Sequence, residues 1–418
     1  MGRFRIRSRA AATVLLGAWA ACGGETSPAT PADGLSGPDH LLDWSVEPVF
    51  QVGGVDAPEW AAFGEVTDLA FDGSGRLHVL DGRGRRVTIL SPRGELEGTV
   101  GIPGEGPGEL RFPSAMAVHG DGRVAVFDPG HSGFVVYGPD GTFLHHVRVD
   151  RQRFSDPEPP LRVTPDGWVV SSTTAPQSSE ESGRPVARLS ALPDQEHQVI
   201  FRAWAPAVPS TREPGPELTG GMRVRLPPVV SFHPGLLVAP VPGGEVAVID
   251  STSWAVKIVQ PDGTLVRTLR RPLTPIPVTE AMRDAERRRR LEEALAEPPP
   301  FMVSTRDGGT ASPAGDMARR FMEARIEGMG FHEVVPVVDG MGMDHMGRIW
   351  VRRSGTEPGG TGPTDVVTTS GDYVGTLAPG TVAMPWAFGA GGLLAYRGTD
   401  SLGAPLVRVV RLQEGDGR

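Results

Sequence analysis

The sequence predicts an all-β fold made of repeated units of four short strands, on three observations. Residues 68–94 and 115–141 carry the same pattern at a constant offset of 47 residues. Each copy reads as a strand, a glycine-rich turn, a second strand that ends in aspartate, and a third strand. The glycine-rich turn recurs at six places along the chain. A repeat of this length is typical of a propeller blade, so we predict a six-bladed β-propeller.

The glycine-rich turn between the first two strands of a unit counts the blades. Its glycine tolerates the positive φ that a tight hairpin demands, which explains why it recurs while its neighbours vary. Successive turn glycines are 47, 45, 77, 103 and 45 residues apart. The two long spacings indicate insertions of about 30 residues near 204–234 and about 55 residues near 271–333. The turns lie at residues 72–76, 119–123, 164–168, 241–245, 344–348 and 388–392.

The two ends of the chain are predicted to share one blade. Residues 44–52 read as a last strand with no strands before it, whereas the chain finishes on a third strand at 407–412. An N-terminal strand that joins the final blade closes the ring and hides two sheet edges. The propeller is therefore expected to span residues 44–418.

The second insertion, between blades 4 and 5, holds the helices that the sequence predicts. Thr279 is a suitable cap for a helix that runs through Ala296, and a second helix is expected near 316–328. The arginines at 287–290 stand among acidic residues, which favours a solvated helix face with ion pairs. The first insertion is proline-rich and shows no helical period.

Both insertions connect the last strand of one blade to the first strand of the next. In a propeller, such connections lie on the same face as the loops that follow Asp81, Asp128 and Asp250. We name this the lidded face, because two adjacent insertions on it are expected to form a lid over part of the central funnel.

The amino terminus reads as an export signal over residues 1–21. A segment with four arginines precedes an apolar run that is too short to span a bilayer, and Cys22 follows. This arrangement resembles the bacterial lipoprotein signal, in which that cysteine is acylated. An ordinary secretory signal stays open as an alternative, but Cys22 is the single cysteine of the chain and has none to pair with, which favours lipidation. We expect a protein of the cell envelope, anchored at Cys22 on the periplasmic or cell-surface side.

Charge and composition limit the partners. Residues 22–43 lack apolar periodicity and are predicted to form a flexible tether. Removing residues 1–21 takes away four arginines and no acid, which changes the net charge from −9 to −13. A protein this acidic is a poor partner for nucleic acid or anionic lipid surfaces, so contact with the membrane is expected through the lipid anchor only.

The run from Gly104 to Pro113, followed by the Gly122 turn, Asp128 and residues 135–141, resembles the NHL repeat. More broadly, the chain is similar to bacterial six-bladed propellers of the NHL and TolB-like superfamily. The likeness is good over 60–150 and 236–270 and only architectural elsewhere. It implies a fold more than an activity, because the superfamily includes binding scaffolds, lyases and lactonases.

The chemistries of the enzymatic branches find little support in the residues. Gluconolactonase-like members bind a divalent metal with acids and asparagines, and this sequence has no asparagine. The zinc site of amidating-lyase-like members needs converging histidines, whereas the histidines here occupy different registers of their units. The methionines at 341 and 343 align with core positions of other blades and are predicted to fill space between blades. We therefore predict no catalytic residue, no metal ligand and no cofactor, although a divalent cation stays open.

Four residues are candidates for ligand binding: Asp81, Asp128, Asp250 and His345. The three aspartates end their second strands on the lidded face, where a ring of carboxylates could bind a cation or a cationic ligand. The alternative is that each side chain caps its own loop in an Asx turn. Streptogramin-lyase-like chemistry needs a histidine with acids near the axis, and it could recruit His345 beside Asp344 or His332 beside Glu333.

Two functional hypotheses follow. The first is a non-enzymatic, lipid-anchored binding scaffold that holds a protein, peptide or glycan on its lidded face. The second is a metal-dependent lyase or hydrolase with its site in the central funnel, under the 271–333 insertion. The absence of a converging catalytic set favours the first.

Overall fold

The computed structural model describes one compact unit within Pro31–Arg418. The residues described are 35–150, 154, 156–157, 159–172, 183–207, 217–218, 222–223, 229–296, 303–304, 310–311 and 316–415. The expected signal at 1–21 and the expected lipidation site at Cys22 lie outside them. Among the described residues, no helix is long and apolar enough to cross a membrane.

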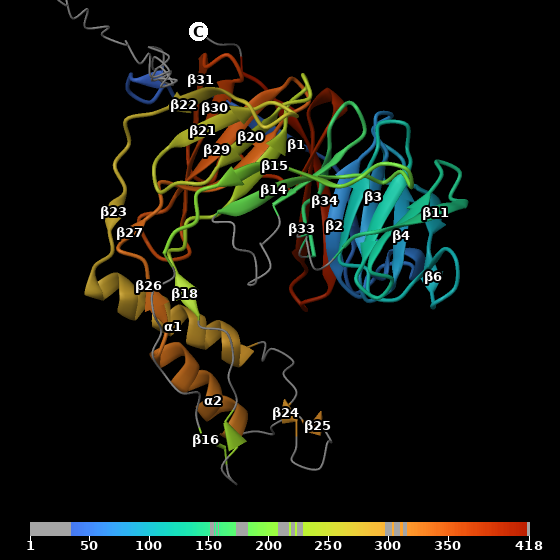
Figure 1. Cartoon of the computed structure of the whole chain (residues 1–418), viewed down its shortest axis with the longest axis horizontal. Helices are drawn as coiled ribbons and strands as arrows, with labels where there is room; N and C mark the ends of the chain where they lie inside the picture. Colours follow the sequence, from blue (N-terminus) through green and yellow to red (C-terminus); the bar gives the residue numbers. More distant parts are fainter. Residues whose placement is uncertain are drawn as a thin grey trace, which may run out of the picture. The chain divides into compact units, whose positions relative to one another are not determined.

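Six four-stranded antiparallel sheets form the blades of a propeller (Figure 1). Blade 1 holds β2 (Val66–Phe71), β3 (Leu77–Asp81), β4 (Arg86–Leu90) and β5 (Leu96–Val100). Blade 2 holds β8 (Ala115–Val118), β9 (Val124–Asp128), β10 (Gly133–Tyr137) and β11 (Phe143–Arg148). Blade 3 holds β12 (Arg162–Val163), β13 (Val169–Ser172), β14 (Arg184–Leu189) and β15 (Gln198–Ala203).

The second half of the ring follows the same order. Blade 4 holds β19 (Leu237–Pro240), β20 (Val246–Ile249), β21 (Ala255–Val259) and β22 (Leu265–Arg270). Blade 5 holds β28 (Val338–Met343), β29 (Arg348–Ser354), β30 (Thr361–Thr368) and β31 (Tyr373–Leu377). Blade 6 holds β32 (Ala387–Gly389), β33 (Leu393–Thr399), β34 (Pro405–Gln413) and, from the N-terminal end, β1 (Ser45–Gly53).

The N-terminal strand closes the ring, as the sequence predicts. β1 pairs antiparallel with β34 from Ser45 opposite Gln413 to Gly53 opposite Leu406. The innermost strands of neighbouring blades contact one another, for example β2 with β8 and β32, and β19 with β28. The six-bladed β-propeller predicted from the repeat is thereby confirmed.

Apolar side chains that alternate along the strands form the cores between adjacent blades. One such core joins blades 4 and 5 around the buried Trp254 and Val351. Met341 and Met343 pack against this core, so their predicted role as space-filling residues is confirmed.

The two insertions pair with each other. β18 (Val230–Ser231) of the first runs parallel to β26 (Gly330–Phe331) of the second. Within the second, β23 (Ile276–Pro277) pairs with β27 (Val334–Val335), and helix α1 (Glu280–Ala296) contacts helix α2 (Asp316–Glu327). Three short strand pairs complete the sheets: β6 (Ile102–Pro103) with β7 (Glu109–Leu110), β16 (Glu217–Leu218) with β17 (Met222–Arg223), and β24 (Val303–Ser304) with β25 (Thr310–Ala311). There are also two 3-10 turns, η2 (Glu59–Ala61) and η3 (Ala390–Gly392).

Helix α1 begins where its sequence indicates. The hydroxyl of Thr279 accepts a hydrogen bond of 3.2 Å from the backbone N–H of Met282, which is the geometry of an N-cap. The helix then runs to Ala296, so both predicted boundaries agree with the structure.

The described part of the expected tether lies against blade 5. The backbone N–H of Leu42 donates to the carbonyl of Thr376, and Leu35 is buried in the core of blades 4 and 5. Asp39 accepts from Arg271 at 2.7 Å and from Arg353 at 2.8 Å. The chain is therefore attached to the propeller from residue 35 onward, before the first strand begins.

Candidate functional site

The three aspartates that end second strands bond to the backbone of neighbouring loops. Asp81 accepts from the N–H groups of Glu65, at 3.0 Å, and Gly84, at 2.9 Å. All three carboxylates are at most 1% exposed. In each blade, this aspartate ties the incoming connection to the end of the second strand.

The other two aspartates repeat this arrangement. Asp128 accepts from the N–H groups of Arg111, Phe112 and Gly130 at 2.6, 2.9 and 2.8 Å. Asp250 accepts from the N–H of Trp204 at 2.8 Å and from Nζ of Lys257 at 2.7 Å. The three belong to different blades, and the structure engages their oxygens with partners inside the protein.

His345 lies at the opposite end of its blade, in the turn between β28 and β29. It is exposed and lines a cavity of about 650 Å³ that the turns of five blades surround. The same cavity is lined by His119, which is 5% exposed and whose Nε2 has no partner among the described residues. Burial lowers the pKa of His119, and Arg123 lowers it further. The structure thus separates His345 from the three aspartates by the height of the propeller.

Asp68 and Arg162 are linked through Trp386 across the central tunnel near the lidded face. Asp68 on β2 accepts from Nε1 of Trp386 at 2.8 Å and from the N–H of Met116 at 2.9 Å. Arg162 on β12 of blade 3 donates to the carbonyl of Trp386, which precedes blade 6. Because blades 3 and 6 are opposite each other in a six-membered ring, this hydrogen bond crosses the tunnel. Burial raises the pKa of Asp68, although Arg162 opposes the rise.

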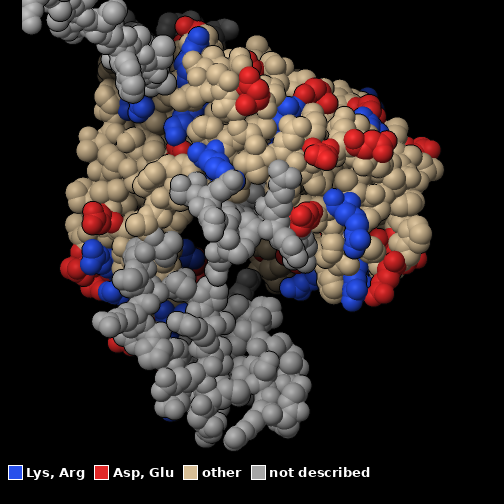
Figure 2. Space-filling model, viewed as in Figure 1, with Lys and Arg blue, Asp and Glu red and all other residues tan. Residues whose placement is uncertain are grey.

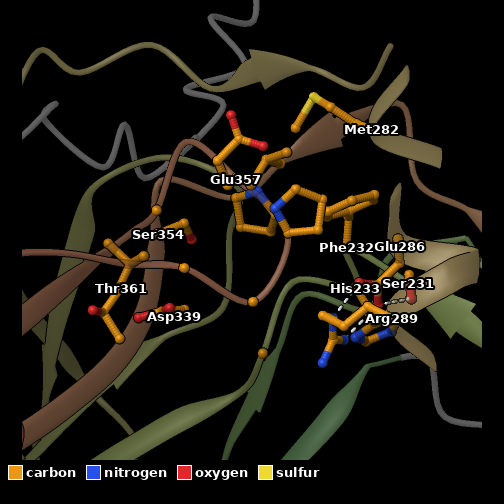
Figure 3. A pocket seen from close by; sticks show the side chains of 18 of the residues that line it. Ser231, Phe232, His233, Met282, Glu286, Arg289, Asp339, Ser354, Glu357 and Thr361 are labelled. Atoms are coloured by element: carbon orange, nitrogen blue, oxygen red, sulfur yellow. Dashed lines mark hydrogen bonds and ion pairs between the residues drawn. The ribbon is translucent and has the colours of Figure 1, made fainter. Parts of the chain in front are cut away.

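The described residues form a cleft of about 420 Å³ where the two insertions meet blade 5 on the lidded face. Its walls come from the segment after β18, from α1, from the start of β28, and from the loop between β29 and β30. In Figure 3, Ser231, Glu286 and Arg289 lie together on one side, whereas Asp339, Ser354 and Thr361 lie on the other. The cleft therefore combines segments that are about a hundred residues apart in sequence.

Glu286 organises the helical wall of the cleft. It is 3% exposed and accepts from Oγ of Ser231 at 2.8 Å, from Arg289 at 2.7 and 2.8 Å, and from Nε of Arg290 at 2.9 Å. Burial by itself would raise the pKa of Glu286, but the hydrogen bonds from Arg289, Arg290 and Ser231 outweigh it and lower the pKa to about 2. The carboxylate thus stays charged and fixes both arginines.

Asp339 and Arg352 form the blade wall. Nε of Arg352 donates to Asp339 at 2.7 Å across β28 and β29. Gly340 faces this guanidinium, and a Cβ there would approach Cζ of Arg352 to 3.2 Å. Burial raises the pKa of Asp339, and Arg352 opposes the rise. Glycine at position 340 therefore leaves room for the side chain of Arg352 against β28.

The junction of the insertions carries a strained residue. Phe232 has a φ of 58°, in the left-handed region that bulky residues avoid. Its ring lies 6.1 Å from that of Phe331, and the rings of His233 and His332 lie 5.1 Å apart edge to face. Burial lowers the pKa of both histidines, and the neighbouring His332 lowers the pKa of His233 further. Backbone strain of this kind persists only where surrounding contacts enforce it.

Sequence reasoning did not find this cleft. The arginines at 287–290 were expected on a solvated face, and ion pairs with Glu286 and Glu293 are present. However, Glu286 itself is buried, and Arg289 and Arg290 line the cleft. The sequence contains both Glu286 on the predicted helix and Ser231 in the other insertion. Nothing in the repeat pattern indicates that these two residues pair.

Metal binding has no assembled ligand set in the described part of the chain, where no group of three or more His, Cys, Asp or Glu side chains could hold a metal ion. Charges on the surface are mixed in sign. In the view of Figure 2, Lys and Arg side chains lie interspersed with Asp and Glu over the described residues.

No protein-family model matches the chain, and no curated protein matches it either. Solved propeller structures do match along most of its length. A Bacteroides fragilis protein thought to be exported is 12% identical, with a TM-score of 0.47, over 90% of this chain and 96% of that one. A gluconolactonase from Xanthomonas campestris is 15% identical, with a TM-score of 0.40, over 90% and 98%.

A virginiamycin B lyase from Staphylococcus aureus, bound to quinupristin, is 11% identical, with a TM-score of 0.39, over 86% of this chain and 80% of that one. At such low identities, the matches concern the fold only. The chain is a six-bladed β-propeller, and its own residues have to carry any statement on activity.

Proposed function

We propose that the protein is a lipid-anchored, extracytoplasmic binding scaffold that holds its ligand in the cleft between the insertions and blade 5. The observation that carries the proposal is the cleft itself. It combines a concave surface on the lidded face with charged side chains that are fixed in place by one another. Ligand sites are concave and usually carry a few fixed polar groups among apolar ones.

The sequence supports the location of the scaffold. Residues 1–21 have the pattern of an export signal, and Cys22 follows in the position of an acylated cysteine. Two or more acyl chains on that residue would hold the protein on a membrane, since each buried CH₂ contributes about 0.8 kcal/mol. A ligand protein, peptide or glycan of the envelope would then reach the lidded face.

The link across the tunnel counts against the second hypothesis, a metal-dependent lyase or hydrolase in the funnel. Near the lidded face, Asp68 and Arg162 both form hydrogen bonds with Trp386 across the tunnel. A substrate on the axis would have to displace a buried carboxylate and a guanidinium that neutralise each other, which is costly.

Binding arrays of envelope peptides and glycans test the proposal. The full chain, extracted from membranes in detergent, is applied together with Arg352→Ala and with Arg93→Ala as a control on the opposite face. We expect ligands whose binding is lost in Arg352→Ala and kept in Arg93→Ala. Ligands that ignore Arg352→Ala, or a stoichiometric metal ion in the purified protein, would contradict the scaffold at this cleft.

A further inference from the structure

The cleft presents two guanidinium groups with unused donors. Arg290 bonds through Nε to Glu286, at 2.9 Å, and Arg352 bonds through Nε to Asp339, at 2.7 Å. No Nη nitrogen of either residue has a hydrogen-bond partner among the described residues. An arginine that is fixed by its Nε and free at its Nη atoms is prepared to bind a carboxylate, because little side-chain freedom is left to lose.

Arg289 differs from these two arginines and serves as part of the wall. It bonds to both oxygens of Glu286 and to Glu293, so its donors are engaged. The loop after β29 packs onto it: a Cβ at Gly359 would come within 2.9 Å of Cδ of Arg289. This contact joins the insertion to blade 5 and fixes the width of the cleft.

The same cleft carries an acidic side chain that has no partner among the described residues. Glu357 lies in the loop between β29 and β30, is exposed, and lines the cleft. Its carboxylate has no hydrogen bond or ion pair among the described residues. In Figure 3, Glu357 lies apart from the group formed by Ser231, Glu286 and Arg289. The cleft therefore offers free cationic donors and a free anionic acceptor at separate places.

Apolar side chains form the surface between these charges. Phe232, Met282, Val335 and Val338 line the cleft, together with Pro336 and Pro358. A ligand that fits has to bring a carboxylate, a cationic group and apolar surface in a volume of about 420 Å³.

We propose that the cleft binds a short zwitterionic peptide of about two or three residues with apolar side chains. Its terminal carboxylate bonds to one of the two guanidinium groups, that of Arg290 or that of Arg352, its terminal ammonium bonds to Glu357, and its side chains pack on Phe232 and Met282. The ligand is neutral overall, which matches a cleft in which Arg289, Arg290 and Arg352 balance Glu286, Asp339 and Glu357. This inference rests on the proposed function and names its ligand class.

Isothermal titration with a library of apolar tripeptides tests the proposal. The full chain in detergent is titrated with three forms of the library: free at both ends, amidated at the carboxyl end, and acetylated at the amino end. We expect each block to weaken binding by about tenfold, the equivalent of one charge-assisted hydrogen bond.

Matched variants assign the two ends. In the double variant Arg290→Gln with Arg352→Gln, amidation should cost less than about twofold while acetylation keeps its full effect. In Glu357→Gln, acetylation should cost less than about twofold while amidation keeps its full effect. Arg288→Gln, on the exposed side of α1, and Glu95→Gln, on the opposite face, should behave as the parent protein. Because each variant is compared with itself across the three libraries, partial loss of fold does not imitate this pattern.

The outcomes separate the inference from the proposed function. The zwitterion site would be overturned if neither amidation nor acetylation weakens binding, or if both still weaken binding to the variants. The proposal of a binding scaffold would not be affected by either result. If no free tripeptide binds while an array ligand is lost in Arg352→Ala, the ligand class is wrong and the cleft is right. If neither binds, both proposals fail.

Discussion

Carboxylates in blades 1 and 2 serve a different purpose from those at the junction of the insertions with blade 5. Asp81 and Asp128 accept mainly from backbone N–H groups of neighbouring loops, and their side-chain partners, Arg86 and His131, come from the same blades. Glu286 and Asp339 accept from arginine side chains, whose remaining donors face a cleft. The comparison teaches that the partners of a carboxylate decide whether the groups around it can bind a ligand.

The largest expected effect tests the structural side of this comparison. Asp128→Ala removes the acceptor of three backbone N–H groups at a fully buried position. Leaving such donors unsatisfied should lower the free energy of unfolding by about 3 kcal/mol, measured by urea denaturation. Asp121→Ala, an exposed aspartate of the same blade, is the control and should cost less than about 1 kcal/mol. Equal costs would mean that the backbone contacts of Asp128 contribute little.

The next effect concerns pH and Glu286. Hydrogen bonds from three side chains hold its pKa at about 2, below the value near 4.3 of an unfolded chain. A lowered folded pKa gives stability that is fully present above about pH 4.3 and is lost as pH falls toward 2. The difference in unfolding free energy between the parent protein and Glu286→Gln should therefore be about 2 kcal/mol at pH 6 and shrink toward pH 2.5. A difference that does not change with pH would show that the charge of Glu286 is not what stabilises the junction.

A smaller effect is expected when the blade wall of the cleft is disturbed. In Gly340→Ala, the new Cβ would meet the guanidinium of Arg352 at 3.2 Å and push it from β28. Peptide binding should weaken about threefold to tenfold while unfolding changes by less than about 1 kcal/mol. Gly98→Ala is the control, because a Cβ there meets nothing within 4 Å. Unchanged binding in Gly340→Ala would show that the position of Arg352 is not critical.

The smallest effect concerns a turn that breaks the repeat. Asp72 and Asp344 accept backbone N–H groups of their own turns, whereas His119 at the same turn position has a buried Nε2 with no partner in the described chain. His119→Phe removes that unsatisfied atom at similar size, so the free energy of unfolding should stay within about 1 kcal/mol or rise. A clear loss in thermal unfolding would mean that the imidazole contributes a contact that matters to the fold.

The repeats made much of this fold predictable from the sequence. The glycine turns counted six blades, and the residues at 44–52 were recognised as the missing strand of the last one. The first residue of α1 followed from the capping residue Thr279. The attachment of residues 35–43 to the propeller could not be predicted from the sequence. Asp39 meets Arg271 and Arg353 only after segments that are distant in sequence have folded together.

By itself, the sequence determined the blades, their closure and the face that carries the insertions, because these depend on strand period and turn chemistry, which are local. The tertiary structure alone decided the cleft. Ser231 meets Glu286, and Gly359 meets Arg289, across chain separations that no periodicity records. The Nη donors of Arg290 and Arg352, which have no partner among the described residues, arise from the same cause, because each guanidinium is fixed at its Nε only after the chain has folded.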